Sequence, residues 1–485
     1  MVDSGLSEFK KWIQISNLEE KKHQIEGIRW CLQRELETEY TDSTYYSKQG
    51  GIIADEMGLG KTILSLGLIY SNFLDKTLIV VPPSLIPQWV EQSQNLLGHT
   101  PVIYHGVHKP KITDEQLDNA RIVITSYAHI SLDKIEESQN QSQNTQSNSP
   151  LRTLHKIKWN RVIFDEAHHM RNQKMSFWGA KRLKTDICWM LTGTPIHNKV
   201  GDLKAYLHLL NIPKIFINNN DILPSICKEI LMRRTKEEAK LTLPTVNEHL
   251  IEVEWSSEKE KDLAEQIHAE AGLFDVTREN IDKAIKYIGQ HILTKLLRSR
   301  QVCILPSMLK YKLDEFITVN PTEKEIHGVF ENSKIKSVVS KLLERKDNNR
   351  KKLVFCHYRR EIDHIYENMV TNGVSCEFFD GRVSSAKRQI ILQTSPDVLI
   401  LQTQTACEGL NLQQYQEVYF VSPHWNPSVE DQAVGRCHRI GQTQEIDVFR
   451  FAMNNFGTHR GVTLDNYCIL VQNIKRKMRS IIETK

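Results

Sequence analysis

Residues 50–69 read GGIIADEMGLGKTILSLGLI, and this stretch decides the fold class. A short apolar run at 50–53 has the look of a buried strand, and the glycine-containing segment 54–60 follows it directly. An apolar stretch with helical spacing, 63–69, comes next. Strand, glycine-containing loop and helix stand in the order of a phosphate-binding loop, so the sequence predicts an α/β domain that binds a nucleotide.

The residue types in this loop suit a nucleotide triphosphate. Backbone N–H groups around Gly58 and Gly60 can cradle phosphate oxygens, because glycine permits the turn and a helix N-terminus favours negative charge. Lys61 would reach the β- and γ-phosphates, and the Thr62 hydroxyl would ligate Mg²⁺. Asp55 stands where the strict G-x-x-x-x-G-K-T pattern has its first glycine, so this motif alone is only moderately specific.

A second motif supplies the acidic half of such a site. Residues 161–168, RVIFDEAH, place Asp165 and Glu166 at the end of an apolar, β-branched run. Asp165 can hold Mg²⁺ through water, and Glu166 can polarise the attacking water. An isolated Asp-Glu pair is often only the acidic end of a strand. Here the two halves occur in the correct order on matching strands, which favours the catalytic interpretation.

Length and composition describe a multidomain globular protein. The 485 residues exceed what one hydrophobic core usually holds, which predicts two or three domains. The 40% hydrophobic and 25% charged residues are average for soluble proteins. The net charge of +4 decides little, because a nucleic-acid footprint can be a local basic channel.

Two sets of apolar, β-branched runs predict two parallel-sheet α/β domains in tandem. The runs of the first set are 77–81, 121–125, 161–164 and 187–191, and those of the second are 352–356, 398–401 and 418–421. Between the sets, 256–300 has helical spacing and many Lys and Glu residues. We therefore predict two tandem RecA-like domains with a helical insertion between them.

The expected boundaries follow from these runs. The first lobe would span 1–245, the helical insertion or linker 246–325, and the second lobe 326–485 with a C-terminal brace helix. The Ser/Gln/Asn tract 136–150 cannot bury enough apolar surface to offset its ordering entropy, and we expect a flexible loop there.

Other features exclude several protein classes. No apolar run is long enough to span a bilayer, and the N-terminus lacks the apolar core of a signal peptide. We therefore expect an intracellular protein with no membrane partner, nuclear if the host is a eukaryote. The nine cysteines include no C-x-x-C pair, which argues against zinc and favours reduced structural thiols.

These motifs resemble those of the Swi/Snf-like DNA-dependent ATPases of helicase superfamily two, almost from end to end. The first-lobe matches are HQIEGIRW (23–30), DEMGLGKT (55–62), VVPPSLIPQW (80–89), ITSY (124–127), the DEAH box (165–168), LTGTP (191–195) and LMRRTK (231–236). The resemblance implies that Gln24 reads adenine. It also implies that the nucleotide is bound by the whole loop: Asp55, Glu56, Met57, Gly58, Leu59, Gly60, Lys61 and Thr62.

The second half continues the resemblance with LLRSRQVC (296–303), FDG (379–381), QT (404–405), EGLNL (408–412), WNP (425–427) and QAVGRCHRIGQ (432–442). In the family, two arginines of the last string reach the γ-phosphate, so the resemblance makes Arg436 and Arg439 arginine fingers. It also implies that Thr125, Ser126 and Thr405 grip the DNA backbone, although each is by itself a common cap or turn residue. The basic run 475–479 could be a nuclear signal or a DNA contact, and a solvated helix face is the plainer interpretation.

The His-Gln entry, the Arg34-Glu35 pair and the double glycine before the loop resemble the branch of repair-associated ubiquitin ligases and transcription terminators. The cysteine spacing excludes the zinc-binding RING module of those ligases. The chain is similar to a motor core without such accessory modules. Its targeting would then come from protein partners.

The sequence thus predicts an ATP- and Mg²⁺-dependent enzyme that translocates on double-stranded DNA and remodels or displaces bound proteins. Two alternatives stay open: a strand-separating DNA or RNA helicase, and a DNA-binding scaffold that does not hydrolyse ATP. The intact catalytic residues argue against the scaffold. The sequence does not disclose the physiological target.

Overall fold

The computed structural model describes residues 1–36, 49–132, 153–171, 173–193, 195, 201–219, 221–241, 243–273, 293–309, 332–403, 410–457 and 461–483. The chain divides into two compact units, Met1–Thr242 and Leu243–Lys485, here called the first and second lobes. The predicted flexible loop 136–150 lies outside the described residues. The functional boundaries at 245 and 325 stay predictions.

The first lobe is built on a seven-stranded sheet in which every pair is parallel. Its strands, in spatial order, are β3 (Val102–Tyr104), β4 (Ile122–Ser126), β2 (Thr77–Val81), β5 (Lys158–Phe164), β6 (Lys184–Leu191), β1 (Gln49–Ile53) and β7 (Leu231–Met232). Its helices are α1 (Val2–Ile15), α2 (Lys22–Leu36), α3 (Lys61–Ser71), α4 (Ile86–Leu97), α5 (Asp114–Asn119), α6 (Tyr127–Ile130), α7 (Thr153–Lys156), α8 (Met175–Arg182), α9 (Gly201–Leu209), α10 (Lys214–Ile217) and α11 (Leu223–Ile230).

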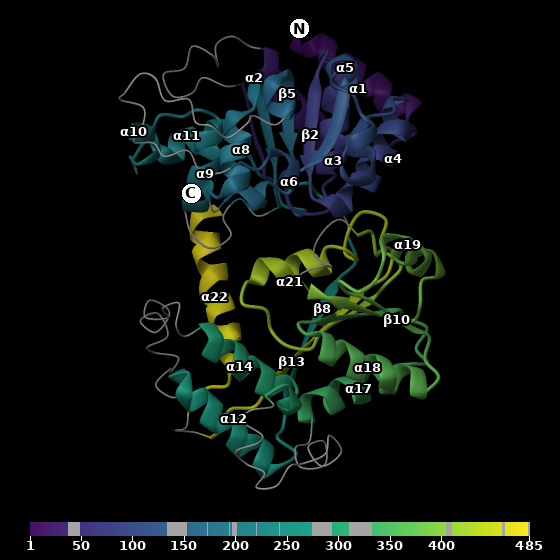
Figure 1. Cartoon of the computed structure of the whole chain (residues 1–485), viewed down its shortest axis with the longest axis vertical. Helices are drawn as coiled ribbons and strands as arrows, with labels where there is room; N and C mark the ends of the chain where they lie inside the picture. The colour runs from purple at the N-terminus through teal and green to yellow at the C-terminus, as the bar shows by residue number, and fades with distance from the viewer. Residues whose placement is uncertain are drawn as a thin grey trace. The chain divides into compact units, whose positions relative to one another are not determined.

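Both faces of this sheet are buried, which explains why its strands are continuously apolar. Adjacent residues of β1 belong to different cores, since Ile52 packs in one cluster and Ile53 in the other. Helices α1 to α4 cover the second cluster, and α8, α9 and α11 cover the first (Figure 1). The carboxyl ends of the strands therefore form one edge at which loops can build a site.

The second lobe carries a six-stranded sheet, also parallel throughout. Its strands, in spatial order, are β10 (Cys376–Phe379), β11 (Val398–Gln402), β9 (Lys352–Cys356), β12 (Glu417–Phe420), β13 (Ile446–Met453) and β8 (Val246–Val253). The helices are α12 (Glu258–Glu270), α14 (Leu293–Ile304), α17 (Ser333–Glu344), α18 (Arg359–Thr371), α19 (Ser385–Thr394), α21 (Pro427–Val434) and α22 (Leu464–Glu483). Helices α17 and α18 lie on one face of this sheet (Figure 1).

The predicted fold class is confirmed: two parallel-sheet α/β domains follow one another, and helices α12 and α14 lie between β8 and α17 in the sequence. One detail of the prediction is wrong. Residues 246–253, expected to begin the helical insertion, form strand β8, which pairs with β13 at the edge of the second sheet. None of the described helices is long and apolar enough to cross a membrane.

Candidate active site

The phosphate loop connects β1 to α3 at the carboxyl edge of the first sheet. Gly58 and Gly60 have φ angles of +93° and +82°, a region that strains residues with a side chain. Gly60 immediately precedes α3, so the loop delivers its backbone to the N-terminus of that helix. A Cβ on Gly60 would lie 2.8 Å from Gln24 Nε2. The left-handed conformation therefore favours glycine at this position, and the Gln24 amide lies directly against it.

Lys61 lies across the loop. Its Nζ donates to the carbonyl of Asp55 at 2.7 Å and to that of Glu56 at 3.4 Å. A Cβ on Gly193, in the LTGTP motif, would lie 3.8 Å from the same Nζ. The lysine amine is thus held between the phosphate loop and the segment that follows β6.

Asp165 follows the last residue of β5 and is almost fully buried. Trp89 Nε1 donates to its Oδ2 at 2.8 Å, and the Glu166 amide donates to its Oδ1 at 2.9 Å. Burial, with the charge of Glu166, raises the pKa of Asp165 to about 6, while Trp89 and Lys61 act in the opposite direction. The two motifs that the sequence predicted to cooperate therefore lie within electrostatic reach of each other.

Glu166 adopts a left-handed backbone conformation, with φ +49° and ψ +50°. Such a conformation costs a non-glycine residue about 1–3 kcal/mol and is often found at functional sites. The carboxylate Oε2 lies 3.2 Å from His168 Nδ1, and the His168 ring stacks on His169. His168, the fourth residue of the DEAH motif, therefore lies beside the carboxylate of the second.

The segment after β7 braces the loop, and sequence analysis assigned it no role there. Arg234 Nε donates a hydrogen bond to Asp55 Oδ1 at 3.0 Å, and its Nη2 donates to Asp55 Oδ2. The remaining nitrogen of this guanidinium, Nη1, donates to the His23 carbonyl. The Lys236 amide donates to Glu56 Oε2 at 2.8 Å. Asp55 is thus the anchor that ties the loop to this segment, which accounts for an aspartate in place of glycine. The only sequence signal was the LMRRTK motif itself.

Helix α2 brings Gln24 to the loop. His23 Nε2 lies 3.1 Å from the Leu59 carbonyl, and burial lowers the pKa of His23, so the neutral ring can donate this bond. Gln24 is 7% exposed, with its amide beside Gly60. The entry motif therefore lies directly on the phosphate loop.

The predicted DNA contacts are not gathered into one surface by the described residues. Thr125 and Ser126, at the end of β4, are fully buried. Thr125 Oγ1 donates to the Tyr104 carbonyl at 2.8 Å, and Ser126 Oγ lies 3.0 Å from His105 Nδ1. Thr405 lies outside the described residues, and a role for all three in gripping DNA stays a prediction.

The second lobe places Arg436 and Arg439 just after α21. Gln442 fixes this segment, because its Nε2 donates to the Gln413 carbonyl at 2.8 Å and its Oε1 accepts from the next two backbone amides. Arg436 is 6% exposed. Burial, and then the charge of Arg436, lower the pKa of Arg439. The two guanidinium groups are therefore close enough to repel each other.

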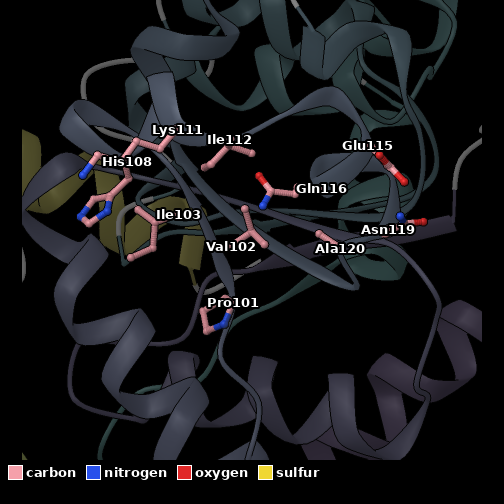
Figure 2. Close-up of a pocket in the computed structure, with 10 residues that line it drawn as sticks. All are labelled: Pro101, Val102, Ile103, His108, Lys111, Ile112, Glu115, Gln116, Asn119 and Ala120. Carbon is pink, nitrogen blue, oxygen red and sulfur yellow. The ribbon is translucent and has the colours of Figure 1, made fainter.

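A separate hollow of about 660 Å³ lies beside the edge strand β3 (Figure 2). Side chains of β3, of α5 and of the turn between them line it, among them His108, Lys111 and Glu115. None of the ten lining residues belongs to the candidate active site. The hollow therefore has no part in the nucleotide chemistry described above.

The chain is similar to known proteins along most of its length. A family model described as the SNF2-related domain matches residues 23–308, and the helicase conserved C-terminal domain matches 333–441. A solved structure, the Sulfolobus solfataricus SWI2/SNF2 ATPase core in complex with dsDNA, is 23% identical and covers 90% of this chain and 88% of that one, with a TM-score of 0.38.

Among curated proteins, a probable global transactivator of Orgyia pseudotsugata multicapsid polyhedrosis virus is 28% identical over 89% of this chain and 86% of its own length. An uncharacterized ATP-dependent helicase of Mycoplasma pneumoniae is 28% identical over 90% of this chain, and human chromodomain-helicase-DNA-binding protein 9 is 26% identical over 90%. The chain spans 40% and 16% of those two proteins. The first family model covers more than half of the sequence, and the chain therefore belongs to the Swi/Snf-like, SNF2-related family of ATPases in helicase superfamily two.

Proposed function

We propose that this chain is an ATP-dependent double-stranded DNA translocase that remodels or displaces DNA-bound proteins. The observation that carries the proposal is the convergence of Lys61, Asp165 and Glu166 at one edge of the first sheet in a chain of this family. The human relative is named a helicase and DNA-binding protein, and the viral relative is named a probable transactivator. These names support a nucleic-acid partner.

In this proposal the first lobe binds ATP as its substrate. The loop amides cradle the phosphates, Gln24 reads adenine, and Lys61 exchanges the carbonyls of Asp55 and Glu56 for phosphate oxygens. Glu166 accepts a hydrogen bond from the attacking water and polarises it. His168 lies 3.2 Å from the Glu166 carboxylate and would help to orient it.

The residues present suit Mg²⁺. This ion is usually held by one or two carboxylates together with substrate phosphates, rather than by an all-protein cage. Asp165, with the Thr62 hydroxyl, would hold it, since a buried carboxylate whose pKa is raised to about 6 gains from a nearby cation. When bound, the ion would neutralise charge on the phosphates.

The second lobe would supply Arg436 and Arg439 to the γ-phosphate during turnover. A guanidinium neutralises developing charge only when it reaches the phosphate, and this would couple hydrolysis to motion of the lobes. Burial and the neighbouring charge of Arg436 lower the pKa of Arg439, and a phosphate beside Arg439 would act in the opposite direction. Thr125, Ser126 and Thr405 stay our proposed DNA contacts, and protein partners our proposed source of targeting.

Displacement of a third DNA strand from a duplex tests this function. A translocase should remove the third strand in an ATP-dependent way while the duplex stays paired, and the Lys61→Ala variant should not. A forked duplex measured in parallel reports strand separation. Separation of the fork would favour the helicase alternative, and ATP binding without turnover on any nucleic acid would favour the scaffold.

A further inference from the structure

Glu35, in the last turn of α2, is a buried carboxylate that three other elements contact. Arg161 of β5 donates to both of its oxygens, from Nε at 2.7 Å and from an Nη at 2.5 Å. Trp189 Nε1 of β6 and Asn72 Nδ2, which follows α3, each donate at 2.7 Å. The carboxylate side chain has no exposed surface. Four charge-assisted hydrogen bonds thus fix the C-terminal end of α2.

Two further hydrogen bonds attach this end of α2 to the sheet. Arg34 Nε donates to the Gly50 carbonyl at 2.8 Å, and Gln49 Nε2 donates to the Glu35 carbonyl at 2.9 Å. Both contacts are to β1, the strand that leads into the phosphate loop. The anchor therefore involves β1, β5 and β6, whose carboxyl ends carry the phosphate loop, Asp165 and the LTGTP motif.

The opposite end of the same helix rests on the phosphate loop. His23 contacts the Leu59 carbonyl at 3.1 Å, and Gln24 lies against Gly60. Gln24 and Glu35 lie at opposite ends of this 15-residue helix, so about 17 Å of helix separates the two attachments. A shift at the Glu35 end is transmitted along the helix to Gln24.

We propose that Glu35 is a positioning residue that sets the place of Gln24 over the phosphate loop, and so sets ATP affinity and base selectivity. The inference rests on the proposed role of Gln24 in reading adenine. A buried ion pair contributes little net stability compared with apolar packing, but it can fix one register of an element. The bidentate Arg161 fork supplies such a fixed geometry.

Two tryptophan variants give a matched test. Trp189→Phe removes one bond to Glu35 and keeps a ring in the core. Trp159→Phe removes the 2.9 Å bond from Trp159 Nε1 to the Leu154 carbonyl, which is equally buried but packs in the cluster on the other face of the sheet. We expect Trp189→Phe to raise KM for ATP by about tenfold and to narrow the preference for ATP over GTP, with kcat little changed. Trp159→Phe should move neither quantity.

Glu35→Gln should produce a larger change in the same direction, because it weakens all four contacts. If that variant does not fold, Asn72→Ala, which removes a single bond, replaces it. An equal rise in KM for Trp189→Phe and Trp159→Phe would overturn the proposal, since it would show general destabilisation.

Gln24→Ala, measured alongside, separates this inference from the function on which it rests. If Gln24→Ala leaves KM and base preference unchanged, the adenine-reading role fails and the positioning role fails with it. If Gln24→Ala changes both while Glu35→Gln and Trp189→Phe change neither, only the positioning role of Glu35 is overturned.

Discussion

The phosphate loop of the first lobe and the arginine segment of the second balance their charges in different ways. In the loop, the Asp55 carboxylate accepts hydrogen bonds from the Arg234 guanidinium, and Lys61 Nζ donates to backbone carbonyls. In the arginine segment, Arg436 lies near enough to lower the pKa of Arg439, in addition to the effect of burial. Asp55 thus has a charged partner within the first lobe, whereas the neighbouring positive charge of Arg436 acts against the protonated form of Arg439.

This difference separates the expected tasks of the two regions. A preformed loop with internal partners can bind a nucleotide without large rearrangement. Two mutually repelling guanidinium groups are better suited to stabilise charge that develops only in the transition state. Substitutions in the loop should therefore lower nucleotide affinity, and substitutions of the two arginines should lower ATP turnover.

The largest expected effect is the loss of hydrolysis in Glu166→Gln and Lys61→Ala. The first removes the carboxylate that polarises water and the second removes the charge facing the phosphates, so turnover should fall to background. The measurement is steady-state ATP turnover with duplex DNA, and Glu91→Gln, an exposed first-lobe carboxylate, is the control. Unchanged turnover in Glu166→Gln would refute the catalytic assignment.

Arg436→Ala and Arg439→Ala should lower turnover by about 10³–10⁵ while nucleotide affinity changes much less, since arginine fingers act mainly in the transition state. Lysine at either position should restore little of the lost turnover, because an ammonium group lacks the planar, two-pronged geometry of a guanidinium. The measurements are kcat and nucleotide binding, with Arg360→Ala, an exposed second-lobe arginine, as control. Near-normal turnover in both alanine variants would remove the functional difference between the two regions.

Arg234→Lys should weaken ATP binding by about 10- to 100-fold, because one lysine cannot replace both bonds to Asp55. Asp55→Asn should have a similar effect, and the double variant should be little worse than either single one. The measurement is the ATP affinity of the two single variants and the double variant, which together form a double-mutant cycle. Additive losses would mean that the two side chains act independently and that the loop is not braced by their contact.

The smallest effect on activity is expected from His268, in the second lobe away from the arginine segment. Its Nδ1 donates to the Ala264 carbonyl at 2.7 Å, its Nε2 accepts from the Leu464 amide at 2.9 Å, and burial lowers its pKa from 6.5 to about 4. The unfolded chain therefore binds a proton before the folded one, and stability is lost as pH falls from 6.5 towards 4.

This linkage amounts to about 2 kcal/mol between pH 7.5 and pH 5. His268→Gln should reduce the fall in unfolding free energy over that range by about the same amount, with DNA-stimulated kcat at pH 7.5 nearly unchanged. Urea unfolding of both proteins at pH 7.5 and pH 5 measures the free energy of unfolding at each pH. An identical pH dependence in the variant would contradict the assignment of a neutral, buried His268.

The sequence predicted strands whose burial is uniform and missed strands whose polar residues have distant partners. The run 77–81 forms β2 with the same bounds, since all five residues are buried. Strand β13 contains Asp447 and Arg450, which break the apolar pattern and are held by Arg350 and Glu430. Edge strand β8 exposes part of its length and has no continuous apolar run.

The same limit applies to the site. The phosphate loop and the DEAH box are local in sequence and were predicted residue by residue. The partners that hold them are remote: Arg234 lies 179 residues from Asp55, and Arg161 lies 126 residues from Glu35. Such contacts depend on the order of strands in the sheet, which a local pattern does not contain.

Turnover of the unaltered protein with different nucleic acids tests the central claim most directly. ATP hydrolysis would be measured with duplex DNA, single-stranded DNA, RNA and no nucleic acid, each at several salt concentrations. We predict the largest stimulation with duplex DNA, falling steeply with salt because phosphates dominate the contacts. Equal or greater stimulation by RNA, or turnover independent of nucleic acid, would contradict the account of a duplex DNA translocase.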